Sequence, residues 1–356
     1  MAQDTESRQW QSSLDGIANL ILDTTTVPAP SSGQLLVKMR AVALNYKDGE
    51  VIEGLMKHHK SATFPKDLVP CSDGVAEVLK VGAEVKDFRA GDRVLSLCFP
   101  LHQTGQVQAK HLANAPGMTD HGVLAEYRLF ENWAVVKVPH YLTDEEAATF
   151  PIAGTTAWMA INGFRPIGQP GGEGQTMLVQ GTGGVSIMGL KLGKASGMKV
   201  IVTSSSDTKL ERAKELGADG TINYSKTPHW DQEVMRLTDG RGVDLILENG
   251  GAQTTSKSFD CIAFGGTIAS IGYVSGKVDP AEDRTNINVR ALSKNFTLVG
   301  LLNGPKDRLE ELLAFCEEHQ VKPVVDKVFE FERAKEALEY LWSGSHFGKV
   351  VVRMPQ

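Results

Sequence analysis

The chain has 356 residues, of which 41% are hydrophobic and 22% charged, and its formal net charge is −6 at pH 7. Two domains are expected, because one compact core seldom accommodates this length. The small acidic excess gives no electrostatic basis for a nucleic-acid partner. No segment reaches the ~18 uninterrupted apolar residues of a membrane span, and residues 1–8 are too polar for a secretory signal. We therefore expect a cytoplasmic protein with no membrane partner.

The first part of the chain predicts a β-rich domain. Runs of partly alternating apolar and polar residues, separated by Gly, Pro and Asp, predict strands at 34–43, 74–81, 93–97 and 134–138. Residues 99–121 show little periodicity and predict a long loop, which is a usual place for substrate contacts. Helices are expected from residue 144 and at 155–161, where the two domains should join.

The middle of the chain predicts a βαβ unit at 176–203, followed by further alternation of strands and helices. Strands are expected at 221–224, 243–247, 267–271 and 296–302, and helices at 210–216, 230–237 and 253–261. Such alternation predicts a parallel sheet covered on both faces. The remaining elements, expected to return to the first domain, are helices at 306–319 and 334–342 and strands at 327–331 and 349–353.

A glycine-rich turn joins the first strand and helix of the βαβ unit. Gly181 would allow the tight bend, Gly183 and Gly184 would let the backbone approach a ligand, and the helix N-terminus would offer unpaired N–H groups to a pyrophosphate. A dinucleotide is therefore expected at Gly181, Thr182, Gly183, Gly184 and Val185. The alternative is that these glycines serve helix packing alone.

Six stretches, taken in this order, make the chain resemble the medium-chain dehydrogenase/reductase superfamily over nearly its whole length. They are ALNYKD at 43–48, GDRV at 91–94, AGTTAW at 153–158, GTGGVS at 181–186, LGAD at 216–219 and HFGKV at 346–350. The resemblance implies an α/β protein with a GroES-like catalytic domain at 1–152 and 303–356. A Rossmann domain, with a doubly wound parallel sheet, would occupy 153–302, and the active site would lie between the domains.

The resemblance also bears on zinc. Zinc-dependent members hold a catalytic metal with Cys, His and a further Cys or acid, whereas the matching positions here are Asn45, Ser72 and Ile152. Isoleucine cannot bind a metal. Only Cys98 lies in the region where those members have four closely spaced structural cysteines. The chain therefore resembles the zinc-free branch of quinone oxidoreductases and enoyl reductases, and no metal is expected.

The residues after the second strand of the βαβ unit predict the cofactor. An NAD-selective domain places an acid there, whereas this chain has Ser204, with Ser205 and Lys209 close by, which suit the 2′-phosphate of NADPH. Tyr224 resembles a tyrosine that packs beside that phosphate in related reductases. The alternative is that the serines only cap the next helix, and Asp207 is the dissenting acid.

The resemblance assigns further cofactor contacts. Thr156 would lie against the nicotinamide, and Lys349 would reach the pyrophosphate unless it is a solvated lysine at a strand end. Backbone at Gly272, Tyr273, Leu301, Leu302 and Asn303 would line the carboxamide side.

Without a metal, reduction of an activated C=C bond or a quinone is easier than that of a simple ketone, because modest hydrogen-bond donors can hold an enolate oxygen. Tyr46, Asn45 and Asp48 are the candidate catalytic residues, although Lys47 and Asp48 could form only a surface ion pair. We thus expect an NADPH-dependent reductase of α,β-unsaturated carbonyls or quinones. The alternatives are a carbonyl or alcohol oxidoreductase and a non-catalytic NADPH-binding protein. A homodimer is expected through the apolar run 296–302.

Overall fold

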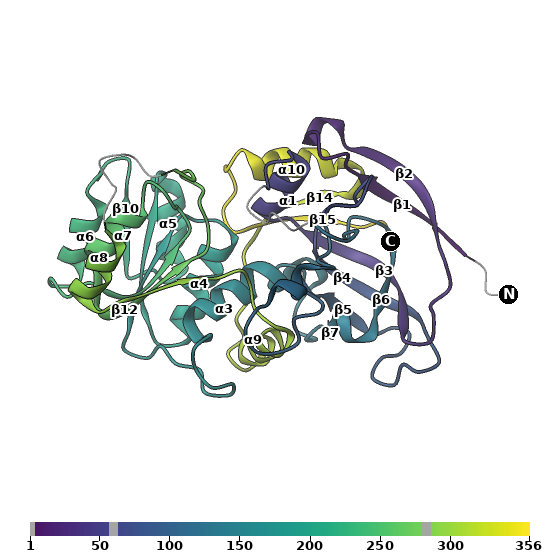
Figure 1. The fold of residues 1–356 in the computed structure, drawn as a ribbon, viewed down its shortest axis with the longest axis horizontal. Coiled ribbons are helices and arrows are strands. Elements are labelled where there is room, and N and C mark those ends of the chain that lie inside the picture. Colours follow the sequence, from purple (N-terminus) through teal and green to yellow (C-terminus); the bar gives the residue numbers. More distant parts are fainter. Residues whose placement is uncertain (1–3, 57–62, 279–285) are drawn as a thin grey trace. The chain divides into compact units, whose positions relative to one another are not determined.

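The computed structural model describes residues 4–56, 63–278 and 286–356 and divides the chain into two compact units (Figure 1). The end unit comprises Met1–Ala153, Pro305–Glu317 and Lys322–Gln356, and the middle unit comprises Gly154–Gly304 and Glu318–Val321. Both termini therefore belong to one unit, and the predicted ranges 1–152, 153–302 and 303–356 differ from the observed ones at their edges.

The end unit is mainly antiparallel β-structure. Its nine strands in the described residues are β1 (Thr5–Gln11), β2 (Ile21–Val27), β3 (Gln34–Ala43), β4 (Asp73–Val81), β5 (Arg93–Ser96), β6 (Tyr127–Glu131), β7 (Val135–Lys137), β14 (Val325–Glu330) and β15 (Lys349–Arg353). Its helices are α1 (Tyr46–Ile52), α2 (Asp144–Ala147), α9 (Lys306–Glu318) and α10 (Ala334–Trp342). The sheet order is β14-β15-β3-β4-β5-β7, with β6 paired to β3, while β1 and β2 form a separate hairpin.

The middle unit is a parallel six-stranded sheet in the order β10-β9-β8-β11-β12-β13. Its strands are β8 (Thr176–Gln180), β9 (Lys199–Ser204), β10 (Gly220–Asn223), β11 (Val243–Glu248), β12 (Ile262–Ser270) and β13 (Thr297–Gly300). Its helices are α3 (Thr155–Asn162), α4 (Gly184–Ala195), α5 (Asp207–Glu215), α6 (Trp230–Leu237), α7 (Thr255–Cys261) and α8 (Ile287–Lys294). The predicted GroES-like and Rossmann architectures are confirmed.

Alternate residues of the middle strands pack against helices on opposite faces of the sheet. Leu178 and Ile246 share a buried cluster with Trp230 and Val234 of α6. On the other face, a Cβ added to Gly189 of α4 would lie 2.6 Å from Leu247 Cδ2. A bulky helix residue there would push α4 off the sheet, so Gly189 permits the close helix-to-strand approach.

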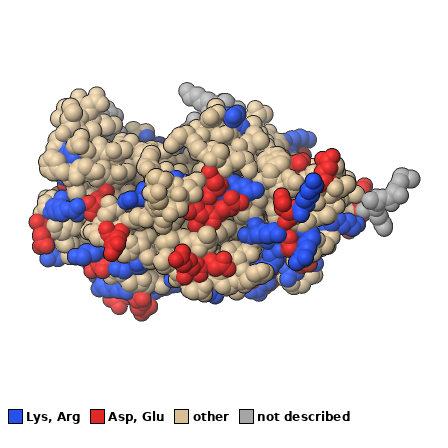
Figure 2. All heavy atoms as spheres, turned by 90° about the horizontal axis from the view of Figure 1, so that it is seen from below, with Lys and Arg blue, Asp and Glu red and all other residues tan. Residues whose placement is uncertain are grey.

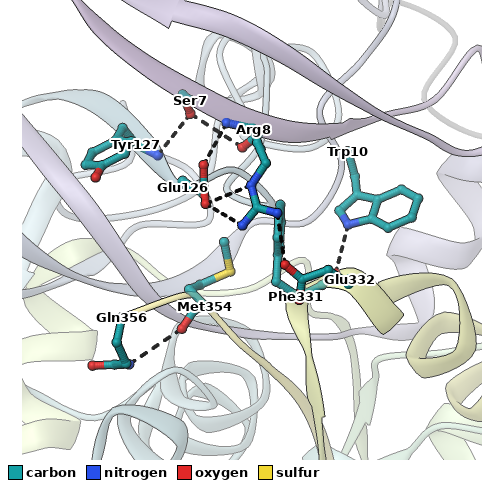
Figure 3. Close-up of polar contacts among 9 residues, drawn as sticks. All are labelled: Ser7, Arg8, Trp10, Glu126, Tyr127, Phe331, Glu332, Met354 and Gln356. Carbon is teal, nitrogen blue, oxygen red and sulfur yellow. Dashed lines mark hydrogen bonds and ion pairs between the residues drawn. The ribbon is translucent and has the colours of Figure 1, made fainter.

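Strand β1, at the beginning of the end unit, forms hydrogen bonds with residues near the C-terminal end of that unit (Figure 3). The Trp10 indole N–H donates to the Phe331 carbonyl at 2.9 Å, and the Arg8 guanidinium donates to both Glu126 and Glu332. The contacts with Phe331 and Glu332 place β1 against residues more than three hundred positions later in the chain, which local sequence patterns do not reveal.

Two surface properties bear on possible partners. Lysine and arginine are interspersed with aspartate and glutamate on the face drawn in Figure 2. Within the described ranges, no helix has both the length and the apolar composition needed to cross a membrane.

Candidate functional site

The carboxyl ends of the middle strands gather most of the predicted cofactor residues. Strand order diverges between β8 and β11, and ligands of such sheets bind beyond the strand ends at that switch point. The residues that follow these strand ends are Gly181, Thr182, Gly183, Gly184 and Val185 after β8, Ser205 and Lys209 after β9, Tyr224 after β10, Gly272 and Tyr273 after β12, and Leu301, Leu302 and Asn303 after β13. Ser204 is the last residue of β9.

The glycine turn has the backbone geometry that an anion site requires. Gly181 has φ +78°, which side-chain-bearing residues rarely adopt, and its N–H donates to the Thr203 carbonyl at 2.9 Å. Gly183 is the N-cap of α4 and has no side chain to satisfy the first helical N–H groups. The start of α4 therefore has no side-chain cap, which is the backbone arrangement that the predicted dinucleotide contact requires.

Ser186, in the first turn of α4, takes part in a hydrogen-bond network. Its hydroxyl donates to the Gln180 carbonyl at 2.7 Å and accepts from the Asn249 amide at 3.2 Å. The Gln180 amide also donates to the buried Glu248 carboxylate at 2.6 Å. This network, which the sequence did not reveal, joins the carboxyl ends of β8 and β11 on either side of the switch point.

The end of β9 lacks the acid that would repel a 2′-phosphate. Ser204 is buried, Ser205 is exposed, and the Tyr224 N–H donates to the Ser204 carbonyl at 3.1 Å. The Ser206 hydroxyl caps α5 by accepting from the Lys209 N–H, so the capping alternative holds for that serine.

Asp207, the dissenting acid, is already engaged. Its carboxylate accepts from the Asn223 amide at 2.7 Å and pairs with Lys226. The hydrogen bonds from Lys226 and Asn223 lower the pKa of Asp207. Asp207 is therefore balanced by a neighbouring cation rather than left as an isolated negative charge.

Two residues assigned to the nicotinamide end are in contact within the middle unit. The Thr156 hydroxyl donates to the Asn303 amide oxygen at 3.5 Å, and both side chains are buried. Gly272 lies so close to the chain after β11 that an added Cβ would be 2.8 Å from the Asn249 carbonyl oxygen. Tyr273 is half-buried, with the Lys277 ammonium 4.4 Å from its ring centre, whereas Leu302 is 40% exposed.

The end unit contains a second group of predicted residues, centred on Lys349. Its ammonium donates to the Leu44 carbonyl at 2.5 Å and to the Asn45 side-chain oxygen at 2.7 Å. Strand register explains this meeting, because β15 and β3 pair up to Val351 and Ala43, and two residues beyond that pair in the same antiparallel register are Lys349 and Asn45. Lys349 is only 5% exposed, so the alternative of a solvated lysine is wrong.

Two buried carboxylates neighbour this ammonium. Asp48 accepts from the Asn45 N–H at 2.8 Å and lies 3.9 Å from the Lys47 ammonium, and Asp73 accepts from the Ser72 hydroxyl at 2.8 Å. Burial raises the pKa of Asp48 to about 6 despite the opposing effect of Lys47. Burial also raises the pKa of Asp73 and lowers that of Lys349. Because Asp48 is buried, a surface ion pair with Lys47 is excluded.

Tyr46, the first residue of α1, differs from its neighbours in being 42% exposed. Its ring stacks on Trp342, the last residue of α10, with ring centres 5.1 Å apart and planes 14° from parallel. The stack holds the ring in one orientation while part of it stays accessible. Nothing in the sequence pattern singles out Trp342, because its partner lies almost three hundred residues earlier.

Two family models of known proteins match separate parts of this chain. Residues 31–140 match a family model described as alcohol dehydrogenase GroES-like domain, and residues 184–318 match one described as zinc-binding dehydrogenase. A zinc-type alcohol dehydrogenase-like protein of Schizosaccharomyces pombe is 38% identical over 322 residues, which cover 90% of this chain and 91% of that protein. The chain belongs to the medium-chain dehydrogenase/reductase superfamily.

Other members of this superfamily are similar over almost the whole chain. A crystal structure of a proposed alcohol dehydrogenase from Sinorhizobium meliloti 1021 superposes with a TM-score of 0.86, is 34% identical, and covers 99% of this chain and 100% of its own. A chloroplastic quinone oxidoreductase of Triphysaria versicolor is 26% identical, with 95% of this chain and 94% of that protein covered. The protein is thus an oxidoreductase of the superfamily.

The three positions that the sequence resemblance matches to zinc ligands contact the buried charged residues around Lys349. The Asn45 side chain holds Lys349, the Ser72 hydroxyl donates to Asp73, and the Ile152 backbone N–H donates to the other Asp73 oxygen at 3.0 Å. A search of the described ranges finds no group of three His, Cys, Asp or Glu side chains able to hold a metal. All four cysteines are buried, and none of them forms a disulfide bond within the described residues.

The raised pKa of Asp48 predicts a pH-dependent stability. The folded protein holds this proton up to about pH 6, whereas the unfolded chain releases it near its ordinary pKa of 3.8. Ionisation therefore destabilises the fold as pH rises, by about 2 kcal/mol between pH 4 and pH 7. In urea denaturation, the free energy of unfolding of Asp48→Asn should increase relative to that of wild type as the pH is raised from 4 to 7. Asp15→Asn, at an exposed position, is the control, and its free energy of unfolding should differ from that of wild type by the same amount at each pH. A difference that is equally constant for Asp48→Asn would contradict the assignment.

Proposed function

We propose that this protein is a zinc-independent, NADPH-dependent reductase of α,β-unsaturated carbonyls or quinones. The observation that carries the proposal is the Lys349 cluster, where an amide, a hydroxyl and an isoleucine match the metal-ligand positions. Electrophilic assistance must then come from hydrogen-bond donors, which suits acceptors whose negative charge spreads onto an oxygen. A cytoplasmic location is part of the same proposal.

Each unit has its own part in this proposal. NADPH would be held by the turn at Gly181 and Gly183, and it supplies a hydride to the acceptor. In the end unit, Tyr46 donates a hydrogen bond or proton to the acceptor oxygen. Asn45 is positioned by Lys349, whose ammonium donates to its side-chain oxygen, and by Asp48, whose carboxylate accepts from its backbone N–H. Buried Asp48 is a positioning residue in this scheme and does not itself contact the acceptor.

The choice of NADPH rests on charge at the end of β9. Ser204 and Ser205 stand where an NAD-selective domain has an acid, and Lys209 follows in the first turn of α5. The engaged Asp207 carboxylate, balanced by Lys226, offers little repulsion to a phosphate dianion. Lys349 could contribute its remaining ammonium donor to the pyrophosphate, as predicted from the resemblance.

The acceptor class can be tested by NADPH consumption with enones, quinones, simple ketones and, in reverse, alcohols with NADP+. We expect turnover of enones or quinones in the presence of a chelator. Tyr46→Phe should lower kcat about 10- to 100-fold with little change in KM, because the donor acts in the transition state. Tyr141→Phe, in the same unit but outside the site, should behave as wild type.

Several outcomes would contradict this scheme. Unchanged kcat in Tyr46→Phe would remove Tyr46 from the mechanism, and turnover of alcohols and ketones alone would favour the alcohol oxidoreductase alternative. Tight NADPH binding without turnover of any acceptor would favour a nucleotide-binding protein without activity. Stoichiometric zinc whose removal abolishes activity would refute zinc independence.

Cofactor selectivity can be tested separately at Lys209. Lys209→Ala should raise the Kd for NADPH about tenfold, the effect of one lost charge-assisted hydrogen bond, and change that for NADH less than twofold. Lys214→Ala, near the other end of the same helix, is the matched control. Fluorescence titration gives both constants, and equal losses for the two nucleotides would contradict the phosphate assignment.

We also propose a homodimer formed through β13. Among the residues that the structure describes, this strand is the edge of the middle sheet, and Leu298 is 39% exposed on it. Leu292, on the helix α8 that precedes β13, is 80% exposed, and Phe264, on the neighbouring strand β12, is 79% exposed. An unpaired edge beside exposed apolar side chains is a common site of association.

The dimer is tested by substituting the exposed apolar residues of this edge. Phe264→Glu combined with Leu298→Lys should convert a dimer into a monomer in light scattering, because both charges would be buried by pairing. Leu237→Lys lies on α6, beside the opposite edge strand β10, and should stay dimeric. A wild-type monomer, or a doubly substituted dimer, would refute the proposed interface.

A further inference from the structure

Glu248, the last residue of β11, is a buried carboxylate at the carboxyl edge of the middle sheet, with 1% of its surface exposed. Its donors are the Gln180 side-chain amide, the backbone N–H groups of Gly250 and Gly251, and the hydroxyls of Thr254 and Ser258. Burial of a carboxylate is costly unless hydrogen-bond donors surround it, and a buried network satisfied in this way is rigid. The arrangement therefore holds the segments that carry these donors in fixed positions around one side chain.

One carboxylate oxygen of Glu248, Oε1, holds the loop between β11 and α7. It accepts from the Gly250 N–H at 3.1 Å and from the Gly251 N–H at 3.0 Å, and the Thr254 hydroxyl donates to the same oxygen. Thr254 is the N-cap of α7, so the contact also fixes the start of that helix. The loop at 249–254 thus curls around Oε1, and its course depends on an acceptor at that point.

The other carboxylate oxygen, Oε2, orients Gln180 at the end of β8 by accepting from its amide at 2.6 Å. The Gln180 amide oxygen accepts in turn from the Asn249 N–H at 3.2 Å. The Asn249 side chain donates to the Gln180 carbonyl and to the Ser186 hydroxyl, each at 3.2 Å. Gln180 and Ser186 flank the glycine turn at 181–185, so the hydrogen bonds that begin at Glu248 reach both ends of this turn.

The loop after β11 is hydrogen-bonded to the loop after β12. The Ser275 N–H donates to the Gly250 carbonyl at 2.7 Å. The Val274 N–H donates to the Asn249 carbonyl at 3.1 Å. Residues 272–273, which the resemblance assigns to the carboxamide side of the nicotinamide, precede these donors in the same loop. Because β8, β11 and β12 are neighbours in the sheet, one network reaches the ends of all three strands.

We propose that Glu248 is a positioning residue of the nucleotide site, which fixes the segments after β8, β11 and β12 without touching the nucleotide. The inference rests on the nucleotide binding proposed above. The segments after β8 and β12 would serve the pyrophosphate and the nicotinamide, which are groups that NADPH and NADH share. Loss of the carboxylate should therefore weaken the binding of both nucleotides equally, whereas a change at Lys209 acts on the 2′-phosphate.

Glu248→Gln tests this inference, because the side chain keeps its size while one oxygen becomes an NH2 group that cannot accept from these donors. We expect the Kd values of NADPH and NADH each to rise about tenfold in fluorescence titration, since a buried network loses an acceptor. In hydrogen exchange of the free protein, the amides of Gly250 and Gly251 should exchange several-fold faster, while those within β8 and β11 keep their rates.

Thr254→Val is a second variant, which covers the case of an unstable Glu248→Gln. It removes one donor to Glu248 and keeps a β-branched side chain, so both Kd values should rise about threefold. Thr238→Val is the matched control, because the Thr238 hydroxyl donates to the Val234 carbonyl at 2.8 Å, before the amino end of β11. Both threonine variants should lower the free energy of unfolding in urea, but only Thr254→Val should weaken nucleotide binding.

The outcomes separate this inference from the proposed function. Wild-type Kd values in both Glu248→Gln and Thr254→Val would overturn the inference and leave the proposed function intact. A loss confined to NADPH, or an equal loss in Thr254→Val and Thr238→Val, would overturn it in the same way. A wild-type protein that binds neither nucleotide would refute the proposed function, and the inference with it.

Discussion

The hydrogen bond between the Lys349 ammonium and the Asn45 amide is the constraint on which the candidate site depends. It joins the first residue of the last strand to the residue that precedes α1, at a position where both are buried. A buried ammonium is costly unless it is paired, so the surrounding backbone and carboxylates must be arranged to satisfy it. The need to pair this buried ammonium therefore explains two features of the end unit. It brings the first and last parts of the chain together, and it arranges the side chains of the candidate site.

Charge balance in this cluster is consistent with the proposed zinc-independent chemistry. Lys47 and Lys349 face Asp48 and Asp73, so the four formal charges cancel. A divalent cation in the same place would add two positive charges beside two ammonium groups in a region of low dielectric, which is strongly unfavourable. The residues that the resemblance matches to metal-ligand positions and the ammonium groups of buried Lys349 and partly buried Lys47 thus support the same proposal.

The sequence predicted the middle unit well because its signals are local. Alternating strands and helices, a glycine turn and serines after β9 are all readable within short windows. The predictions missed β1, β2 and β6, as well as α1 and α8. Most of β2 is exposed and polar, so it lacks the alternation that marks a strand, and no residue of α8 is buried. Asn45, Tyr46 and Asp48 were selected by resemblance, whereas their partners Lys349 and Trp342 depend on strand register and helix packing across the whole chain.

The Tyr46 side chain is partly exposed to solvent and is also held in one orientation. A tyrosine that donates to a substrate must be exposed, yet an exposed side chain ordinarily samples several rotamers. Stacking on Trp342 restricts the ring, and the indole fits only because residue 49 is glycine, where an added Cβ would lie 2.4 Å from Trp342 Cε3. Glycine within a helix costs about 1 kcal/mol relative to alanine. Helix propensity therefore disfavours glycine at this position of α1, and the room that the indole needs explains why it is present. Gly49 thus belongs to the candidate site even though it has no side chain to contribute.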